Sequence, residues 1–125
     1  MDPVGGLIFG VGLLFLAGVL QTVKSQVSSG TLTRNSAVGI RTKATQSSDA
    51  AWEAGHRAAG PWLLASSITG AAAGVTAIVV AVALLATGGE NPAVIAVPSA
   101  GLVAMMALLV TAAVKADSSA KNADS

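Results

Sequence analysis

Cysteine and tyrosine are absent from this chain of 125 residues, and it contains only two tryptophans, two phenylalanines and one histidine. Without cysteine there is neither a disulfide nor a thiolate metal ligand. Charged residues make up 10% of the chain, against roughly 25% in an ordinary soluble domain. The formal net charge of +1 lacks the basic excess that nucleic-acid binding requires. One histidine and scattered carboxylates do not form a metal cage, so we expect no nucleic acid, no metal and no other cofactor.

What the chain has in abundance is apolar sequence, and it lies in three runs without charge. Hydrophobic residues make up 53% of the chain. The charges that bound the three runs are Asp2 and Lys24, Arg57 and Glu90, and Glu90 and Lys115. A helix needs roughly 20 apolar residues to cross a hydrocarbon core of about 30 Å. We therefore predict an all-α membrane protein with one transmembrane domain, residues 1–114, and spans at about 4–23, 62–86 and 93–114.

Two alternatives to three spans are weaker. A cleaved signal peptide would have a basic leader before its apolar run, whereas the leader here carries Asp2 and neither Lys nor Arg. A soluble helical bundle would need polar faces on its helices, and the three runs offer none. The prolines Pro92 and Pro98 also predict that the third span is tilted or kinked near its start.

The basic residues predict how the chain is oriented. The segment between the first two runs carries Lys24, Arg34, Arg41, Lys43 and Arg57, and the short segment around Glu90 carries none. Because Lys and Arg near span ends stay on the cytoplasmic side, we predict that the N-terminus lies outside the cell membrane. The first loop and the C-terminus would then be cytoplasmic. Residues 115–125 are polar and small, and we expect a disordered tail there.

Small residues indicate which faces of the spans would pack together. Within lipid, helices associate through close packing of small side chains rather than through apolar burial. The candidate positions are Gly6 and Gly10 in the first span, Gly70 and Gly74 in the second, and Ala96, Ala100 and Ala104 in the third. Ser66 and Ser67 lie in the same weakly apolar half of the second span and should avoid lipid by bonding to helix carbonyls.

Between the first two spans lies the longest polar stretch, GIRTKATQSSDAAWEAGHRAAG. Ser47 or Ser48 can cap a helix, and Trp52 and His56 are four residues apart, on one helical face. Gly60 and the proline after it predict a break before the second span. We therefore predict a short amphipathic helix, about residues 48–59, on the cytoplasmic surface of the membrane, with Trp52 at headgroup depth.

The same stretch resembles the signature of the SdpI family of membrane proteins. The residues that carry the resemblance are Asn35, Gly39, Ile40, Arg41, Thr42, Thr45, Ser48, Trp52, His56, Arg57 and Gly60. The tryptophan stands eleven residues after the first arginine, and the histidine stands four after the tryptophan. The resemblance implies a three-span fold and a protein that confers immunity to a toxic peptide, or that holds a signalling partner at the membrane.

Several functions stay open at this point. The first is an immunity or signalling protein that binds a peptide or protein and performs no chemistry. The second is an accessory subunit of a larger membrane complex. An enzyme is not expected, because no nucleophile stands at a useful spacing from His56 and no glycine-rich phosphate loop is present. The polar stretch itself could be a structural clasp between the spans, a docking surface for a partner, or both.

Overall fold

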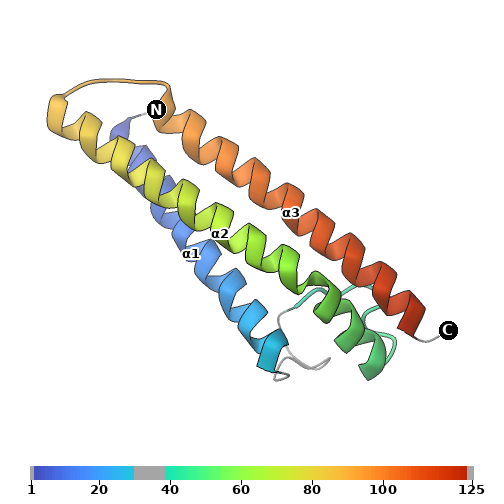
Figure 1. The fold of residues 1–125 in the computed structure, drawn as a ribbon. Helices are drawn as coiled ribbons and strands as arrows, with labels where there is room; N and C mark the ends of the chain where they lie inside the picture. Colours follow the sequence, from blue (N-terminus) through green and yellow to red (C-terminus); the bar gives the residue numbers. More distant parts are fainter. Residues whose placement is uncertain (1, 30–38, 124–125) are drawn as a thin grey trace. The chain divides into compact units, whose positions relative to one another are not determined.

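In a computed structural model, residues 2–29 and 39–123 are described, so Asn35 lies outside the described residues. Three helices follow one another along the chain: α1 (Pro3–Ser29), α2 (Asp49–Thr87) and α3 (Ala93–Ala123) (Figure 1). Each helix is long and apolar enough to cross a membrane. The prediction of an all-α protein with three membrane-spanning helices is therefore confirmed.

The predicted short helix before the second span is wrong, because residues 48–59 do not form an element of their own. α2 is one helix of 39 residues that continues through Pro61. At 1.5 Å per residue it is about 58 Å long, so it is much longer than a bilayer core of about 30 Å requires. Its polar first part therefore continues the helix of the second span beyond the uncharged run 62–86.

Pro61 is tolerated inside α2 for two reasons. A proline normally disfavours helix at the preceding residue, because its ring meets the Cβ of that residue. The preceding residue here is Gly60, which has no Cβ. Pro61 also leaves the carbonyl of Arg57 without a helical donor, but both residues are exposed and water can take the place of that donor.

Pro98 does not break the third span either. α3 runs without interruption from Ala93 to Ala123 with Pro98 inside it. The missing N–H of Pro98 frees the carbonyl of Val94, four residues earlier. That oxygen faces Gly6 of α1, at 3.4 Å from the point where a Cβ on Gly6 would stand. The freed carbonyl is therefore covered by the backbone of a neighbouring helix.

The expected disorder of the tail is not found in its described part. Residues 115–123 belong to α3. Lys121 pairs with Asp117 one turn before it, with 3.0 Å between Nζ and Oδ2. Ala116 and Ala120 are both fully buried. The last turns of α3 are thus helical because they pack against other parts of the chain, which composition alone does not indicate.

The described residues divide into two compact units, and the three helices contribute to both. The first unit holds Met1–Val19 and Ser66–Met106. In it α1 and α2 run antiparallel, since a Cβ on Gly6 would contact Ala81 and one on Gly10 would contact Gly74. The start of α1 also lies beside the start of α3 (Figure 1), where Gly6 meets Val94.

The glycines expected to pack in α1 and α2 do so, but the alanines expected in α3 do not. Gly6, Gly10, Gly70 and Gly74 are all buried. In α3, Ala96 and Ala100 are exposed and Ala104 is only half-buried. The face that α3 uses consists instead of Val94, Pro98, Gly101 and Met105. This choice of face has a steric cause, because Gly101 lets Ala73 of α2 approach closer than any side chain would permit.

Two serine hydroxyls join the helices of this unit. Ser66 Oγ donates to the carbonyl of Met105 in α3 at 3.2 Å, and Ser67 Oγ donates to the carbonyl of Ala17 in α1 at 2.9 Å. Both serines are buried. The prediction that these hydroxyls avoid lipid is confirmed, and their acceptors lie on neighbouring helices rather than on α2 itself.

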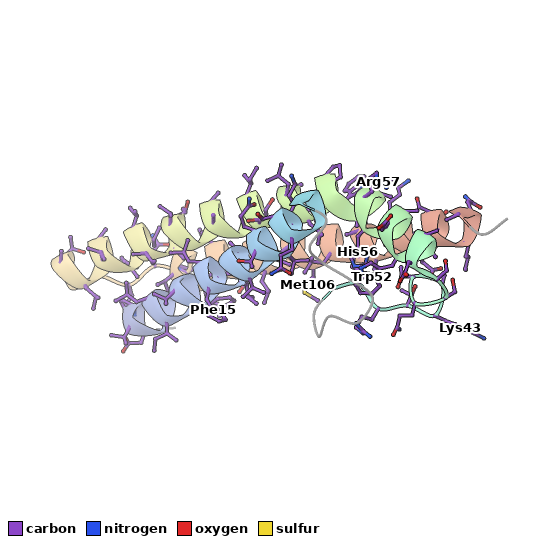
Figure 2. The ribbon with its side chains drawn as sticks, turned by 90° about the horizontal axis from the view of Figure 1, so that it is seen from below. Phe15, Lys43, Trp52, His56, Arg57 and Met106 are labelled. Atoms are coloured by element: carbon purple, nitrogen blue, oxygen red, sulfur yellow. The ribbon has the colours of Figure 1, made fainter. Side chains whose placement is uncertain are left out.

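The outward sides of the helices carry large apolar side chains. Ile8 is 70% exposed, Phe15 71% and Val103 69%, and Figure 2 shows Phe15 and Met106 pointing away from the neighbouring helices. In water such a surface would associate or aggregate. In a bilayer it contacts acyl chains, as a multi-pass membrane protein requires.

The second unit holds Leu20–Ala65 and Ala107–Ser125. Its apolar cluster consists of Ala59 and Leu63 of α2 with Ala112 and Ala116 of α3, all of them buried. The partly buried side chains packed against this cluster are Leu20, Val23, Ile40, Trp62 and Leu109. The polar stretch of the sequence belongs to this unit.

Candidate functional site

Residues 39–48 form a compact turn segment before α2, and two threonines set its shape. The Thr42 N–H donates to Thr45 Oγ1 at 2.9 Å, and the Thr45 N–H donates to Thr42 Oγ1 at 3.1 Å. The Thr45 hydroxyl then donates to the carbonyl of Ile40 at 2.8 Å. Thr45 is fully buried, and its position at the centre of three bonds fixes the path of the segment.

Trp52 and His56 lie side by side on the face of α2 that this segment covers (Figure 2). Their ring centroids are 4.1 Å apart and the ring planes are tilted by 33°. Each side chain is only 2% exposed. The prediction that both residues share a helical face is confirmed. Trp52 is buried inside the protein rather than exposed to lipid headgroups.

The hydrogen bonds of His56 define its protonation state. The Ile40 N–H donates to Nε2 at 2.8 Å, so Nε2 carries no proton. Nδ1 lies 2.9 Å from the carbonyl of Trp52, which can only accept, so Nδ1 carries the proton of a neutral ring. His56 precedes the uncharged run 62–86. Burial lowers its pKa from the ordinary value, and the bond to the Trp52 carbonyl acts more weakly in the opposite direction.

Gly39 is the residue that lets the segment close over these rings. Its φ is +123°, a value that residues other than glycine rarely adopt. A Cβ there would also stand 3.0 Å from His56 Nε2 and 3.0 Å from the Trp52 ring. Both the backbone conformation and the space therefore require glycine at this position.

Arg41 covers Trp52 from the outer side. Its Cζ lies 5.4 Å from the centroid of the Trp52 ring, within the range of a cation–π contact. The guanidinium also donates to Gln46 Oε1 at 3.1 Å. Arg41 itself is exposed, so it joins the buried ring to the water-facing surface.

The end of α3 closes the other side of the segment. A Cβ on Gly55 would stand 2.8 Å from the carbonyl of Ala116 and 3.0 Å from Thr45 Cγ2, so Gly55 permits close contact with both. Asp117, beyond the last uncharged run, has a pKa below its ordinary value, first because Lys121 bonds to it and second because of the Thr42 side chain. Thr42 thus links the segment to α3.

We call Gly39, Arg41, Thr42, Thr45, Trp52 and His56 the signature cluster, since these residues contact one another. Ser48 lies at its edge, where its hydroxyl accepts from the Ala51 N–H at 3.0 Å and caps α2 as predicted. Gly60 is buried one turn further along α2. Arg57 is not part of the cluster: it is exposed and points away from Trp52 and His56 (Figure 2).

Sequence reasoning missed two contributors to this site. Gly55 is by residue type only a weak helix former, yet it permits the contact with Ala116 of α3. Thr45 was only one of several signature positions, yet it is the most buried polar residue of the segment. Gly55 would have been found by asking which positions fall on the Trp52 face, since the two residues are three positions apart. Thr45 precedes α2, so helical spacing does not reveal it.

The arrangement binds the chain to itself. Within residues 2–29 and 39–123, no three His, Asp or Glu side chains gather where they could hold a metal ion. Both ring nitrogens of His56 are occupied by backbone groups. No buried side-chain nitrogen or oxygen of the described residues lacks a hydrogen-bond partner. What the cluster can do is hold residues 39–48 against α2 and α3.

Comparison with known proteins agrees with this arrangement. No curated protein and no solved structure matches the chain. Residues 31–116 match the SdpI/YfhL protein family, which is more than half of the chain. The match contains α2, most of α3 and every residue of the signature cluster. The chain therefore belongs to the SdpI/YfhL family.

Proposed function

We propose that this protein is a non-enzymatic, multi-pass protein of a bacterial cell membrane that binds a peptide or protein partner and acts in immunity or signalling. The observation that carries the proposal is that the signature cluster is used to fold the chain. Its buried polar groups bond to one another and build a folded polar cap on α2 and α3. The charged side chains left at the surface of that cap include Arg41, Lys43, Asp49, Glu53 and Arg57.

The cluster supports binding rather than catalysis for a physical reason. A general base needs a nitrogen or carboxylate within reach of a substrate proton, and His56 already accepts at Nε2 from Ile40. Exposed cations and carboxylates on a rigid support are instead suited to recognising another molecule. We place the cap in the cytoplasm because its basic residues favour that side, and the N-terminus would then lie outside.

The test is tolerance to membrane-active peptides. A susceptible bacterium that expresses the chain would be grown against a panel of such peptides, and we expect raised tolerance to at least one. The matched variants are Arg57→Ala, at the surface, and Trp52→Ala, inside the cluster. Arg57→Ala should keep the protein in the membrane, so lost tolerance with normal abundance would identify a docking surface.

Trp52→Ala should lower both abundance and tolerance, because it removes the buried ring on which the segment packs. Unchanged tolerance across the panel would remove the main support for an immunity role. Purification with a mild detergent would test the alternative: one dominant partner at a fixed ratio would favour an accessory subunit of a larger complex.

A further inference from the structure

Segment 39–48 is attached to α2 by a hydrogen bond whose acceptor can be protonated. The Ile40 N–H donates to His56 Nε2 at 2.8 Å, while Nδ1 faces the carbonyl of Trp52 at 2.9 Å. The first partner can only donate and the second can only accept. Both bonds are therefore satisfied in one state of the ring, which is neutral with its proton on Nδ1.

Protonation of His56 would set two donors against each other. The new N–H on Nε2 would point at the N–H of Ile40, and neither group could bond. The ring is only 2% exposed, so water has little access to either donor. Gly39 packs directly against the ring, since a Cβ at that position would stand 3.0 Å from Nε2. A buried donor left without a partner destabilises the closed arrangement.

The charges on the surrounding elements do not compensate for a charged ring. They are Arg41 and Lys43 on the segment, Asp49, Glu53 and Arg57 on α2, Lys115, Asp117 and Lys121 on α3, and Lys24 on α1. Asp49 and Glu53 are exposed to water, and Asp117 is paired with Lys121 at 3.0 Å. Arg41, the charge in contact with the Trp52 ring, is itself positive. The surroundings therefore favour the neutral ring.

We infer that His56 is a proton-sensitive latch that holds segment 39–48 over Trp52 at neutral pH and releases it when the adjoining aqueous phase becomes acidic. The direction follows from proton binding. Burial keeps the pKa of His56 in the closed arrangement below its ordinary value, so the open arrangement binds more protons. The closed arrangement is complete above the ordinary value of about 6.5 and is lost as the pH falls below it.

Release would uncover the face of α2 that the segment now covers. That face carries Trp52 and Ala51, 2% and 0% exposed, and the covering residue Thr45 is in contact with it through Gly55. Acid would thus convert a closed polar cap into one that presents an apolar, aromatic surface. The latch goes beyond the proposed function, since it operates without any partner.

The test uses Trp52 as the only tryptophan. The Trp62→Phe variant of the full chain, in detergent micelles or lipid nanodiscs, would be titrated from about pH 8 to about pH 5. Quenching of Trp52 by acrylamide, an uncharged reagent, would be measured at each pH. We expect a several-fold rise in the quenching constant with a midpoint below about 6.5. Quenching that stays flat over this range would overturn the latch.

Three further variants assign the transition to the ring. In His56→Gln the amide oxygen can still accept from Ile40 but cannot be protonated, so quenching should stay low throughout. The matched control Glu53→Gln, an exposed carboxylate on the same helix, should keep the transition. A normal pH transition in His56→Gln would overturn the proposal. If His56→Gln does not fold, Asp117→Asn takes its place as the test. A transition retained in Asp117→Asn supports the assignment to His56, and a lost transition overturns the proposal.

Discussion

The closest approach of α1 and α2 can be tested with two glycines of the same helix. Gly10 and Gly12 are two residues apart in α1, and they face opposite surroundings. A Cβ on Gly10 would stand 2.9 Å from the carbonyl oxygen of Gly74 and 2.8 Å from Ile78 Cγ1. A Cβ on Gly12 would meet nothing within 4 Å. We predict that Gly10→Ala destabilises the protein and that Gly12→Ala does not.

The magnitude follows from which contacts can yield. The side chain of Ile78 can rotate, but the backbone oxygen of Gly74 can move only with its helix. Ordinary contact begins at 3.4 Å, so the two helices would have to separate by roughly 0.5 Å, and overpacking of this kind costs about 1–3 kcal/mol. Replacing glycine by alanine also favours a helix by up to about 1 kcal/mol. Because that gain is common to both variants, their stabilities should differ by about 1–3 kcal/mol.

The assay is reversible unfolding in mixed micelles with an increasing fraction of a denaturing detergent, followed by far-ultraviolet circular dichroism. Both variants and the wild type would be compared at the same protein and lipid concentrations. Equal stability of the two variants would refute the reasoning, since it would mean that α1 and α2 do not approach closely at Gly10. A greater loss of stability in Gly12→Ala than in Gly10→Ala would refute the reasoning more strongly.

Three other substitutions test separate parts of the structure. Gly39→Ala combines a positive φ with a steric contact, whereas Gly88→Ala has a positive φ of 69° and open space, so thermal unfolding should show Gly39→Ala to be less stable by about 1–3 kcal/mol. Ser67→Ala removes a bond between helices and should cost about 0.6–1.7 kcal/mol, while Thr76→Ala, whose hydroxyl bonds within α2, should be neutral in the same unfolding assay. Arg41→Ala removes an exposed cation–π contact worth about 0.5–1 kcal/mol, so membrane abundance on immunoblots should stay near normal. A severe loss of abundance would show that Arg41 carries more of the fold than its exposure suggests.

The three spans could be predicted from the sequence because lipid imposes one strong requirement. A run without charge of this length has few alternatives to a helix across the bilayer. The helix ends were harder to predict from the sequence, since they depend on packing contacts in the folded chain. Pro61 suggested a break, but Gly60 removes the clash that would have caused it. Residues 115–123 suggested disorder, but buried Ala116 and Ala120 extend α3.

The packing faces and the site show a similar division. Glycine spacing predicted the buried positions of α1 and α2, because a residue without a side chain lets a neighbouring helix approach closely. The same spacing failed in α3, where the pattern consisted of alanines rather than glycines, and Ala96 and Ala100 are exposed. The signature residues were identified by resemblance, but their arrangement was not. The bond from Ile40 to His56 joins residues sixteen positions apart, and no local pattern specifies it.

The burial of Trp52 has a consequence for how deeply the protein sits in a bilayer. Interfacial tryptophan and tyrosine normally hold a membrane protein at a fixed level. The chain has no tyrosine and two tryptophans, and Trp52 is withdrawn from lipid because it packs inside the cap. Trp62 is then the sole tryptophan left to act as an anchor, and it stands at the start of the uncharged run 62–86. We therefore expect the opposite ends of the helices to adapt freely to bilayers of different thickness by changing their tilt.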